Sequence, residues 1–419
     1  PKAKNERVKS YEPNSSERKE VLKTYNEMIN TFTEVPMYIN GSDVKTKEKK
    51  SINPPHDHGR IVGEYYLAQP SDIDLAIDSA LKAKKSWEAM SWENRSAIFL
   101  KAAELIAGPY RSKINAATMI GQSKTVHQAE IDSACELIDF LRFNVEYVTQ
   151  IYSNQPASDS DAWNRVEYRP LEGFVYAVTP FNFSSIAANL PSSTAIMGNT
   201  GVWKPSRNSY LSNYYLMKLM MDAGLPDGVI NFIPGKASMV GDTCLSHPML
   251  AGIHFTGSTS VFRQMWKDVA NNLENLRSYP RIVGETGGKD FIVAHPKCDK
   301  EALTVALIRG AFEFQGQKCS AASRAYIPES VWDSIKDNYV EQVGKITVGD
   351  PKDFSNFMSA VIDKKSFDNI VGYIERAKQD TGCEVITGGT YDDSTGYFIR
   401  PTTIVCNDPV SYTHLRAHE

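Results

Sequence analysis

The stretch Phe174-Val175-Tyr176-Ala177-Val178-Thr179-Pro180-Phe181-Asn182-Phe183 marks the point where the rhythm of this sequence changes. A short apolar run ends there in polar residues, and a helical pattern follows near 184–197. Four more apolar runs come at 200–203, 229–232, 252–255 and 281–283, with helical stretches between them near 209–223, 236–246 and 259–273. Short strands alternating with helices at steps of about 25 to 30 residues predict a parallel, doubly wound sheet.

The residues on either side of this run predict further elements. Upstream, the patterns favour a helix over 17–34, a hairpin at Asn40-Gly41, a helix opening at Ser71-Asp72, and helices near 93–107, 110–120 and 128–150. Downstream, a strand at 291–294, a helix near 299–315 and a strand at 324–327 begin a second alternating run. We therefore expect an α/β protein with a domain boundary near residue 290.

Composition excludes several function classes. The chain has 419 residues, 42% hydrophobic and 23% charged, with a formal net charge of −4. This is a normal globular composition, and two or three domains fit the length. No basic patch suggests nucleic acid or a membrane surface, and no apolar run is long enough to span a bilayer. The six cysteines are widely scattered, which favours reduced thiols over a disulfide scaffold or a metal site.

Cys319 and Glu285 are the candidates for chemistry. Cys319 stands in Phe314-Gln315-Gly316-Gln317-Lys318-Cys319-Ser320, about thirty residues after Glu285-Thr286-Gly287-Gly288-Lys289. A thiolate can attack an electrophilic carbon, and a carboxylate can activate the water that releases the product. The simpler alternatives are a buried core thiol and a surface-loop acid. The polar neighbours of Cys319 argue against the first, and the two glycines after Glu285 permit close backbone approach or positive φ.

Three other candidates follow predicted strands, where ligands bind in open parallel sheets. Asn182 can donate to a developing oxyanion, or can simply cap the next helix. Lys204 can reach a ribose or phosphate, or can be an ordinary solvated lysine. Gly257-Ser258 can present backbone N–H groups to a phosphate, or can be a plain turn with a serine cap. The Gly-x-Gly-x-x-Gly fingerprint is absent at this point.

Taken together in this order and spacing, these residues resemble the aldehyde dehydrogenase superfamily from about residue 35 to about residue 408. Longer stretches look like its delta-1-pyrroline-5-carboxylate dehydrogenase branch. These stretches are Gln122-Ser123-Lys124-Thr125-Val126-His127-Gln128-Ala129-Glu130-Ile131-Asp132, Glu136-Leu137-Ile138-Asp139-Phe140, Leu171-Glu172-Gly173-Phe174-Val175, Val348-Gly349-Asp350-Pro351 and Ser359-Ala360-Val361-Ile362-Asp363.

The resemblance implies a mechanism and a cofactor. Cys319 would attack the aldehyde of glutamate semialdehyde, Asn182 would hold the oxyanion, and Glu285 would activate water. The hydride would pass to NAD, which would lie in a Rossmann-like domain. The cofactor-binding residues implied are Thr179, Lys204, Ser206, Gly257 and Ser258. No metal is implied.

For the substrate, the resemblance implies that Ser320 contacts the carboxylate, and we expect Glu136 to face the amine unless it is a solvated helix acid. Two positions depart from the family. Arg207 stands where relatives commonly carry an acid, so it could tolerate the 2′-phosphate of NADP. Phe262 stands where the broader superfamily often has a glycine.

The resemblance also sets expectations for organisation. Residues 1–290 would hold the N-terminal helices and the dinucleotide-binding domain, 291–409 a truncated catalytic domain, and 410–419 a non-native tail, since no Glu-x-Phe-Gly-Pro segment follows residue 409. A homo-oligomer is expected at full length, and a mitochondrial matrix location from the family and the basic residues Lys2, Lys4, Arg7 and Lys9. The alternative is a truncated, inactive or structural chain of the same family.

Overall fold

The computed structural model describes residues 2–407, which divide into two compact units. The first comprises residues 2–52, 62–118 and 129–285, and the second 53–61, 119–128 and 286–407. The segments 53–61 and 119–128 thus belong to the second unit although they are flanked by residues of the first. Within the second unit, His56 Nδ1 lies 2.8 Å from Ser123 Oγ, and Gln128 Nε2 donates to the Phe357 carbonyl at 3.2 Å. The domain boundary near residue 290 stays a prediction, and the tail expected at 410–419 lies outside the described residues.

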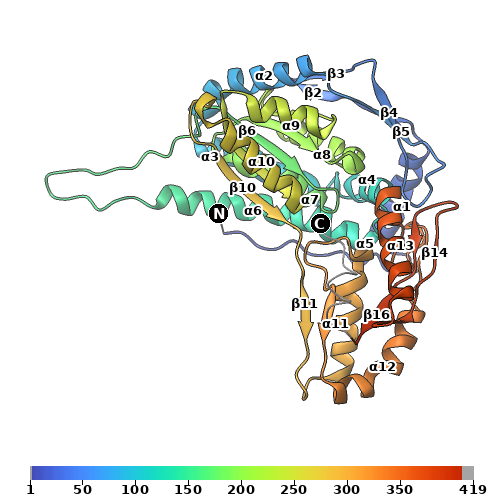
Figure 1. Ribbon diagram of the computed structural model, residues 1–419. Coiled ribbons are helices and arrows are strands. Elements are labelled where there is room, and N and C mark those ends of the chain that lie inside the picture. The colour runs from blue at the N-terminus through green and yellow to red at the C-terminus, as the bar shows by residue number, and fades with distance from the viewer. Residues whose placement is uncertain (1, 408–419) are drawn as a thin grey trace. The chain divides into compact units, whose positions relative to one another are not determined.

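The predicted parallel sheet forms the centre of the first unit (Figure 1). Its strands are β6 (Phe174–Thr179), β7 (Gly201–Pro205), β8 (Ile230–Phe232), β9 (Leu250–Gly257) and β10 (Arg281–Thr286). They lie in the order β10-β9-β6-β7-β8, and β6 pairs in parallel with both β7 and β9. The chain therefore moves outward from β6 in two directions, which is the doubly wound arrangement that the sequence predicts.

A hairpin extends this sheet at the β8 edge. β2 (Met37–Ile39) pairs antiparallel with β8, and β3 (Ser42–Val44) pairs with β2, which makes seven strands. Asn40 and Gly41 both have positive φ, 49° and 79°. Two such residues in a two-residue loop match the twist of the flanking strands, so the predicted hairpin is confirmed. A smaller sheet, β1-β5-β4, joins Thr33–Val35, Gly63–Tyr66 and Lys49–Ile52.

Helices cover both faces of the main sheet. α2 (Pro70–Ala89), α9 (Ala237–Ser246) and α10 (Thr259–Asn271) share a core with Phe174 and Tyr176. α3 (Trp92–Ala107), α6 (Glu136–Ser153), α7 (Ser184–Ile196) and α8 (Tyr210–Ala223) share another with Ala177 and Trp203. Because side chains alternate along a strand, neighbours on β6 enter opposite cores. Burying each large apolar side chain stabilises the unit by roughly 1.5 to 3 kcal/mol.

The helix predicted over 128–150 is interrupted. α5 (Val126–Ala129) passes into a π-helical turn, Glu130–Cys135, before α6 begins. The turn is almost wholly buried, and Glu130 is 0% exposed. π-turns inside helices are frequent at functional sites, and this one ends directly before the candidate Glu136.

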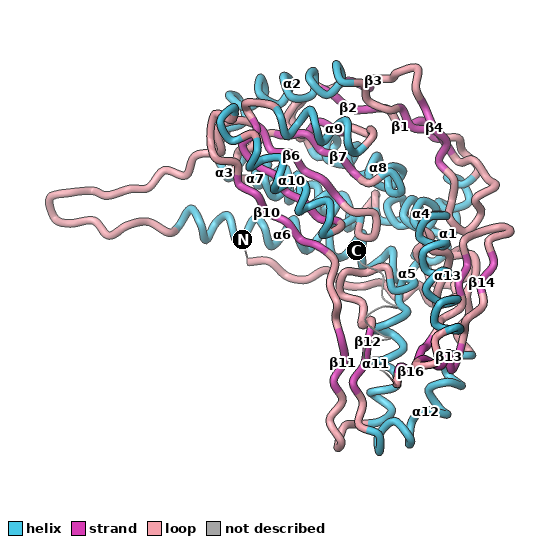
Figure 2. Tube along the Cα trace, in the orientation of Figure 1, coloured by secondary structure: helices cyan, strands magenta, loops and turns pink. Residues whose placement is uncertain are grey.

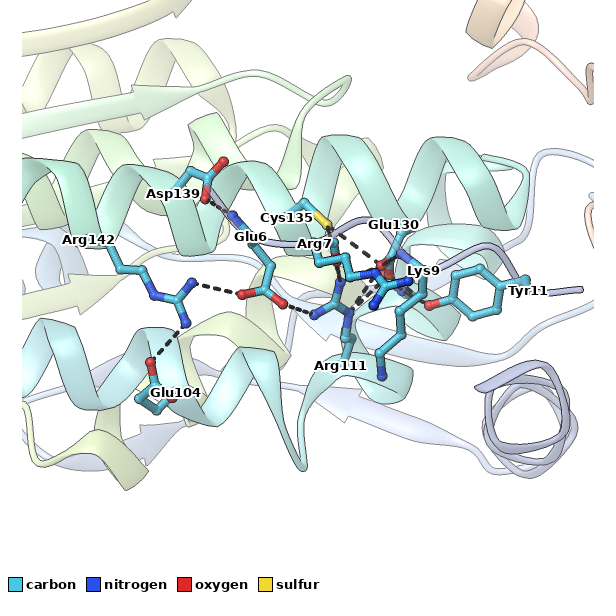
Figure 3. Close-up of polar contacts among 11 residues, drawn as sticks. Glu6, Arg7, Lys9, Tyr11, Glu104, Arg111, Glu130, Cys135, Asp139 and Arg142 are labelled. Carbon is cyan, nitrogen blue, oxygen red and sulfur yellow. Dashed lines mark hydrogen bonds and ion pairs between the residues drawn. The ribbon is translucent and has the colours of Figure 1, made fainter. Parts of the chain in front are cut away.

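An extended N-terminal segment, residues 2–11, runs antiparallel to α6 (Figure 3). Three backbone N–H groups along it donate to acidic side chains: Ala3 to Glu146 at 2.5 Å, Glu6 to Asp139 at 2.6 Å and Lys9 to Glu130 at 2.8 Å. From Ala3 to Glu6 the segment spans about 10 Å, as do the seven helical residues from Asp139 to Glu146. The spacing of the acids along the helix thus suits the spacing of the donors.

Arg111 and Glu130 form a buried ion pair beneath this segment (Figure 3). Arg111, on α4 (Arg111–Gln122), also pairs with Glu6 at 2.7 Å. Tyr11 and Asn115 donate to the same Glu130 carboxylate at 2.7 and 2.8 Å. Burial alone would raise the pKa of Glu130, but its hydrogen bonds from Arg111 and its other donors hold the pKa below the usual value. The charged pair is therefore fully hydrogen-bonded, as a buried pair must be.

The second unit begins with a β–α–β motif, as predicted. β11 (Phe291–Val293) and β12 (Arg324–Tyr326) pair in parallel beside α11 (Lys300–Phe312), as Figure 2 shows. α11 and α12 (Glu329–Gly344) share a core that includes Leu307 and Ile335. α13 (Lys364–Gln379) precedes two antiparallel pairs, β13 (Cys383–Thr387) with β16 (Thr403–Cys406) and β14 (Tyr391–Asp392) with β15 (Phe398–Ile399).

Candidate active site

In the first unit, the candidate residues lie at the ends of neighbouring strands. Thr179 ends β6, Lys204 is the penultimate residue of β7 and Gly257 ends β9. Because the chain leaves β6 toward β7 on one side and β9 on the other, these ends border a topological switch point, where open α/β sheets bind ligands. The remaining candidates of this unit are Asn182 and Ser206 in the following loops, Ser258 before α10, Glu285 on β10 and Glu136 on α6.

Asn182 is not the cap of α7. The capping position belongs to Phe183, and Asn182 lies one residue further out. The assigned capping position is thus not that of Asn182, and its amide stays a candidate oxyanion donor. Glu136 likewise is not a freely solvated acid, because it is half-buried and its Oε2 accepts a hydrogen bond from Ser185 Oγ at 2.5 Å. Ser185 lies in the first turn of α7, three residues after Asn182.

Lys204 is buried, with 7% of its surface exposed, so the solvated alternative is wrong. Burial, with a smaller contribution from Arg207, lowers the pKa of Lys204 to about 8. No acidic side chain within residues 2–407 forms an ion pair with it. A buried cation without a counter-charge is costly unless a ligand supplies acceptors. Beside it, the Trp203 Nε1–H donates to Thr179 Oγ1 at 3.0 Å, which fixes the end of β6 against β7.

Gly257 and Ser258 lead from β9 into α10. A Cβ on Gly257 would lie 2.8 Å from the ring of Phe255, so a side chain there would displace that ring. Ser258 occupies the capping position but makes no side-chain cap hydrogen bond. The ring of Phe262 stacks on Phe255 at a centroid distance of 5.2 Å and lies 2.2 Å from the Cβ position of Gly284. The departure at Phe262 is therefore a packing substitution, which Gly284 accommodates.

Cys319 and Ser320 belong to the second unit. Cys319 is half-buried, in a turn closed by the Ala321 N–H donating to the Lys318 carbonyl at 3.1 Å. Ser320 is exposed. A Cβ on Gly288 would lie 2.6 Å from the carbonyl oxygen of Cys319, so a side chain at this glycine would push the nucleophile away. Of the two options that the paired glycines leave open, Gly288 shows the close backbone approach, and neither Gly287 nor Gly288 has a positive φ.

The residues just before Cys319 adopt an uncommon backbone. Phe314, Gln315 and Gly316 have φ of 50°, 58° and 69°, three left-handed residues in succession. This explains why α11 ends at Phe312 rather than near 315. Left-handed non-glycine residues persist only where their surroundings hold them, and they cluster at functional sites.

Three contacts hold the loop of the candidate nucleophile, residues 314–320, called the nucleophile loop below. Gln315 Nε2 donates to the Ala360 carbonyl at 2.6 Å, and the Ile362 N–H donates to Gln317 Oε1 at 2.9 Å. Lys124 Nζ lies 4.2 Å from the ring centroid of Phe314, and both side chains are fully buried. The sequence analysis assigned these residues no role. The available signal was the position of Lys124, Ala360 and Ile362 within the branch-specific stretches.

Residues 2–407 were also compared with the requirements of a metal site and of a membrane-spanning helix. Within that range no three His, Cys, Asp or Glu side chains gather in a way that could hold a metal ion. Across the same residues, no helix is both long and apolar enough for a membrane span.

Comparison with known proteins gives consistent matches. A sequence model of the aldehyde dehydrogenase family matches residues 40–413. A delta-1-pyrroline-5-carboxylate dehydrogenase of Agaricus bisporus is 48% identical over 416 residues, which are 99% of this chain and 76% of that protein. A mitochondrial enzyme of the same name from Homo sapiens is 42% identical over 409 residues, 97% of this chain and 73% of that protein.

The solved structures agree. The delta-pyrroline-5-carboxylate dehydrogenase of Mycobacterium tuberculosis bound with NAD superimposes with a TM-score of 0.96 at 48% identity. The match covers 98% of this chain and 77% of that one.

Proposed function

Because the chain belongs to the aldehyde dehydrogenase family, we propose that it oxidises L-glutamate γ-semialdehyde, the open form of delta-1-pyrroline-5-carboxylate, to L-glutamate in proline catabolism. The observation that carries this proposal is the extent of the likeness: relatives of that name are 41 to 48% identical over at least 97% of the chain. Nothing in the comparisons favours the alternative of an inactive or structural chain.

NAD is the proposed cofactor, and when bound it accepts the hydride from the substrate carbon. The residues of the first unit fit it. Lys204 offers a buried ammonium to the adenosine ribose, with Ser206 beside it. The N–H groups that open α10 after Gly257 and Ser258 suit the pyrophosphate, because the first N–H groups of a helix have no partner within it. Thr179, which ends β6, would lie beside the same cofactor.

The chain's own groups then perform the chemistry. The Cys319 thiolate attacks the aldehyde carbon and forms a thiohemiacetal. The Asn182 amide and the Cys319 backbone N–H donate to the oxyanion. Loss of the hydride leaves a thioester, which water cleaves after Glu285 removes its proton. In the second unit, Gly288 and the left-handed turn before Cys319 keep the nucleophile in one backbone position.

Substrate selection follows from two residues that contact the carboxylate and the ammonium group, which share the α-carbon of the substrate. Ser320, next to the nucleophile, donates to the substrate carboxylate. Glu136 accepts from the substrate ammonium group, and its bond to Ser185 fixes its carboxylate at the start of α7. Replacing Glu136 by Gln should therefore raise the KM for the natural substrate, and an unchanged KM would rule this role out.

The test of the function is NADH formation from the semialdehyde by the purified protein. Cys319→Ala should abolish turnover, because no other residue forms the covalent intermediate. Glu285→Gln should retain the first hydride transfer but slow the release of glutamate, so that one early burst of NADH precedes a low steady rate. A kcat/KM that is higher with other semialdehydes than with glutamate semialdehyde would instead indicate another aldehyde substrate.

For the cellular setting, we propose a homo-oligomer in the mitochondrial matrix that binds neither nucleic acid nor membranes. Several relatives are named mitochondrial, and a small-molecule substrate is consistent with the family. Light scattering on the purified protein measures the oligomeric state, and fractionation of mitochondria measures the location. A protein recovered with the membrane pellet would contradict this setting.

A further inference from the structure

Two cysteines outside the proposed active site face each other across an antiparallel strand pair. Cys383 begins β13 and Cys406 ends β16, and the two residues are direct partners in the register. Their sulfur atoms lie 3.4 Å apart. We propose that Cys383 and Cys406 form an oxidation site, which glutathione disulfide or a similar disulfide oxidant converts reversibly into an intramolecular disulfide. This proposal does not rest on the proposed function.

The register suits a disulfide. The Asn407 N–H donates to the Gly382 carbonyl at 2.9 Å, which places the hydrogen bond on the residues flanking the pair rather than on the pair itself. Cys383 and Cys406 are therefore a non-hydrogen-bonded pair, in which the Cα atoms come to about 4.5 Å and the side chains lie closest. Disulfides span Cα separations from about 4.4 Å upward, so the bond can form with little backbone movement.

Cys383 and Cys406 are more exposed to solvent than the buried thiols of this chain. Cys383 and Cys406 are both half-exposed, so a small disulfide can reach them. Cys135 and Cys244 are buried, and burial raises the pKa of Cys135 to about 12 and that of Cys244 further still. Because the thiolate is the attacking species, those two thiols are poor partners for exchange.

The reaction balances without any group from the active site. One thiolate of the pair attacks a sulfur of glutathione disulfide, which forms a mixed disulfide and releases one glutathione. The second thiolate attacks the protein sulfur of that mixed disulfide, so the cross-strand bond forms and the second glutathione leaves. Two thiols are oxidised, one glutathione disulfide is reduced to two glutathiones, and the two protons go to the released thiols.

The bond would close a defined loop. The segment between the two cysteines contains the β14–β15 pair and the turn at Gly388-Gly389, where both glycines have positive φ. A Cβ on Gly388 would lie 2.0 Å from the carbonyl oxygen of Pro401, so the two ends of the loop already lie close in the reduced state. Oxidation would restrict the unfolded chain and so protect this loop from unfolding and proteolysis.

The experiment incubates the purified protein with glutathione disulfide, blocks remaining thiols by alkylation, and maps the tryptic peptides by mass spectrometry. The expected product is one linked pair containing Cys383 and Cys406, lighter by two hydrogens and separated again by dithiothreitol. The same link should form in Cys298→Ser and in Cys319→Ser. In Cys383→Ser, Cys406 should instead retain one glutathione.

Two results would overturn the proposal. Recovery of both wild-type residues as alkylated thiols after oxidation would show that the pair does not react. Recovery of two separate glutathione adducts would show that the second exchange fails and that the strands do not bring the sulfurs together. Both outcomes are measured on the wild-type protein, so they do not depend on whether a variant folds.

Discussion

Replacing Lys204 by methionine should make the unliganded protein more stable and its cofactor binding weaker. The lysine is buried beside Arg207, and burial followed by that charge lowers its pKa to about 8. At neutral pH the ammonium is still the main form, but it is less favourable at this position than in water. Methionine has a similar length and volume without the charge, so it should fill the same space.

The magnitude follows from the pKa. A fall from 10.5 in the unfolded chain to about 8 in the folded one corresponds to about 3 kcal/mol, since each unit of pKa is worth about 1.4 kcal/mol. Between pH 8 and 10.5 the unfolded state binds more protons than the folded state, so wild-type stability rises with pH across that window. Below about pH 8 the folded state carries the full free-energy cost of burying the charged ammonium.

Urea unfolding of wild type and Lys204→Met, without cofactor, measures this cost. At pH 7 the variant should be more stable by up to about 3 kcal/mol, and its advantage should shrink as the pH rises toward about 10. NAD should then stabilise the wild type more than the variant, because a ligand stabilises a protein in proportion to its affinity. A variant less stable than wild type at pH 7, or an advantage independent of pH, would refute the reasoning.

Four further predictions test other parts of the structure. Burial lowers the pKa of His56 to about 4, so between about pH 6.5 and 4 the unfolded chain binds a proton that the folded chain does not, and stability falls as the pH drops through that window. His56→Gln should remove up to about 3 kcal/mol of this loss of stability at acid pH, measured by urea unfolding. An unchanged dependence of stability on acid pH would count against this prediction. Glu130→Gln should cost about 3 to 5 kcal/mol in unfolding experiments, because it leaves the buried Arg111 charge uncompensated, and adding Arg111→Met should restore part of the loss. Gln315→Ala should lower kcat while leaving NAD affinity within about twofold, since it loosens only the nucleophile loop, whereas an equal loss of both would indicate general unfolding. Arg207→Glu should lower kcat/KM with NADP relative to NAD by roughly tenfold or more, because an acid there repels the 2′-phosphate, and an unchanged ratio would exclude that contact.

The strands, the hairpin and the strand-end residues could be predicted because each depends on local sequence. Alternation of apolar residues sets the faces of β6, and Asn40-Gly41 requires the positive φ values that its turn shows. In these cases the decisive interaction lies within a few residues of the signal. The two glycines at 287 and 288 indicated close backbone approach or positive φ, but the sequence did not show that Gly288 lies against Cys319.

Other features escaped prediction because distant residues create them. The π-turn at Glu130–Cys135 depends on Arg111, Asn115 and the N-terminal segment, and the helical pattern of 128–150 carries no sign of it. The burial of Lys204 depends on the packing around β7, and isolated strand-end lysines are usually solvated. The left-handed turn before Cys319 likewise includes Phe314 and Gln315, two residues that rarely adopt it.

That left-handed turn explains why widely separated stretches carry the family resemblance. Two non-glycine residues in the left-handed region cost roughly 2 to 4 kcal/mol together. Two hydrogen bonds and one buried cation–π contact, at about 1 kcal/mol or more each, offset a cost of that size. The partners come from residues 122–132 and 359–363, which have no chemistry of their own, through Lys124, Ala360 and Ile362. A change that removes the contact of Lys124, Ala360 or Ile362 should therefore act on the proposed reaction through the backbone position of Cys319.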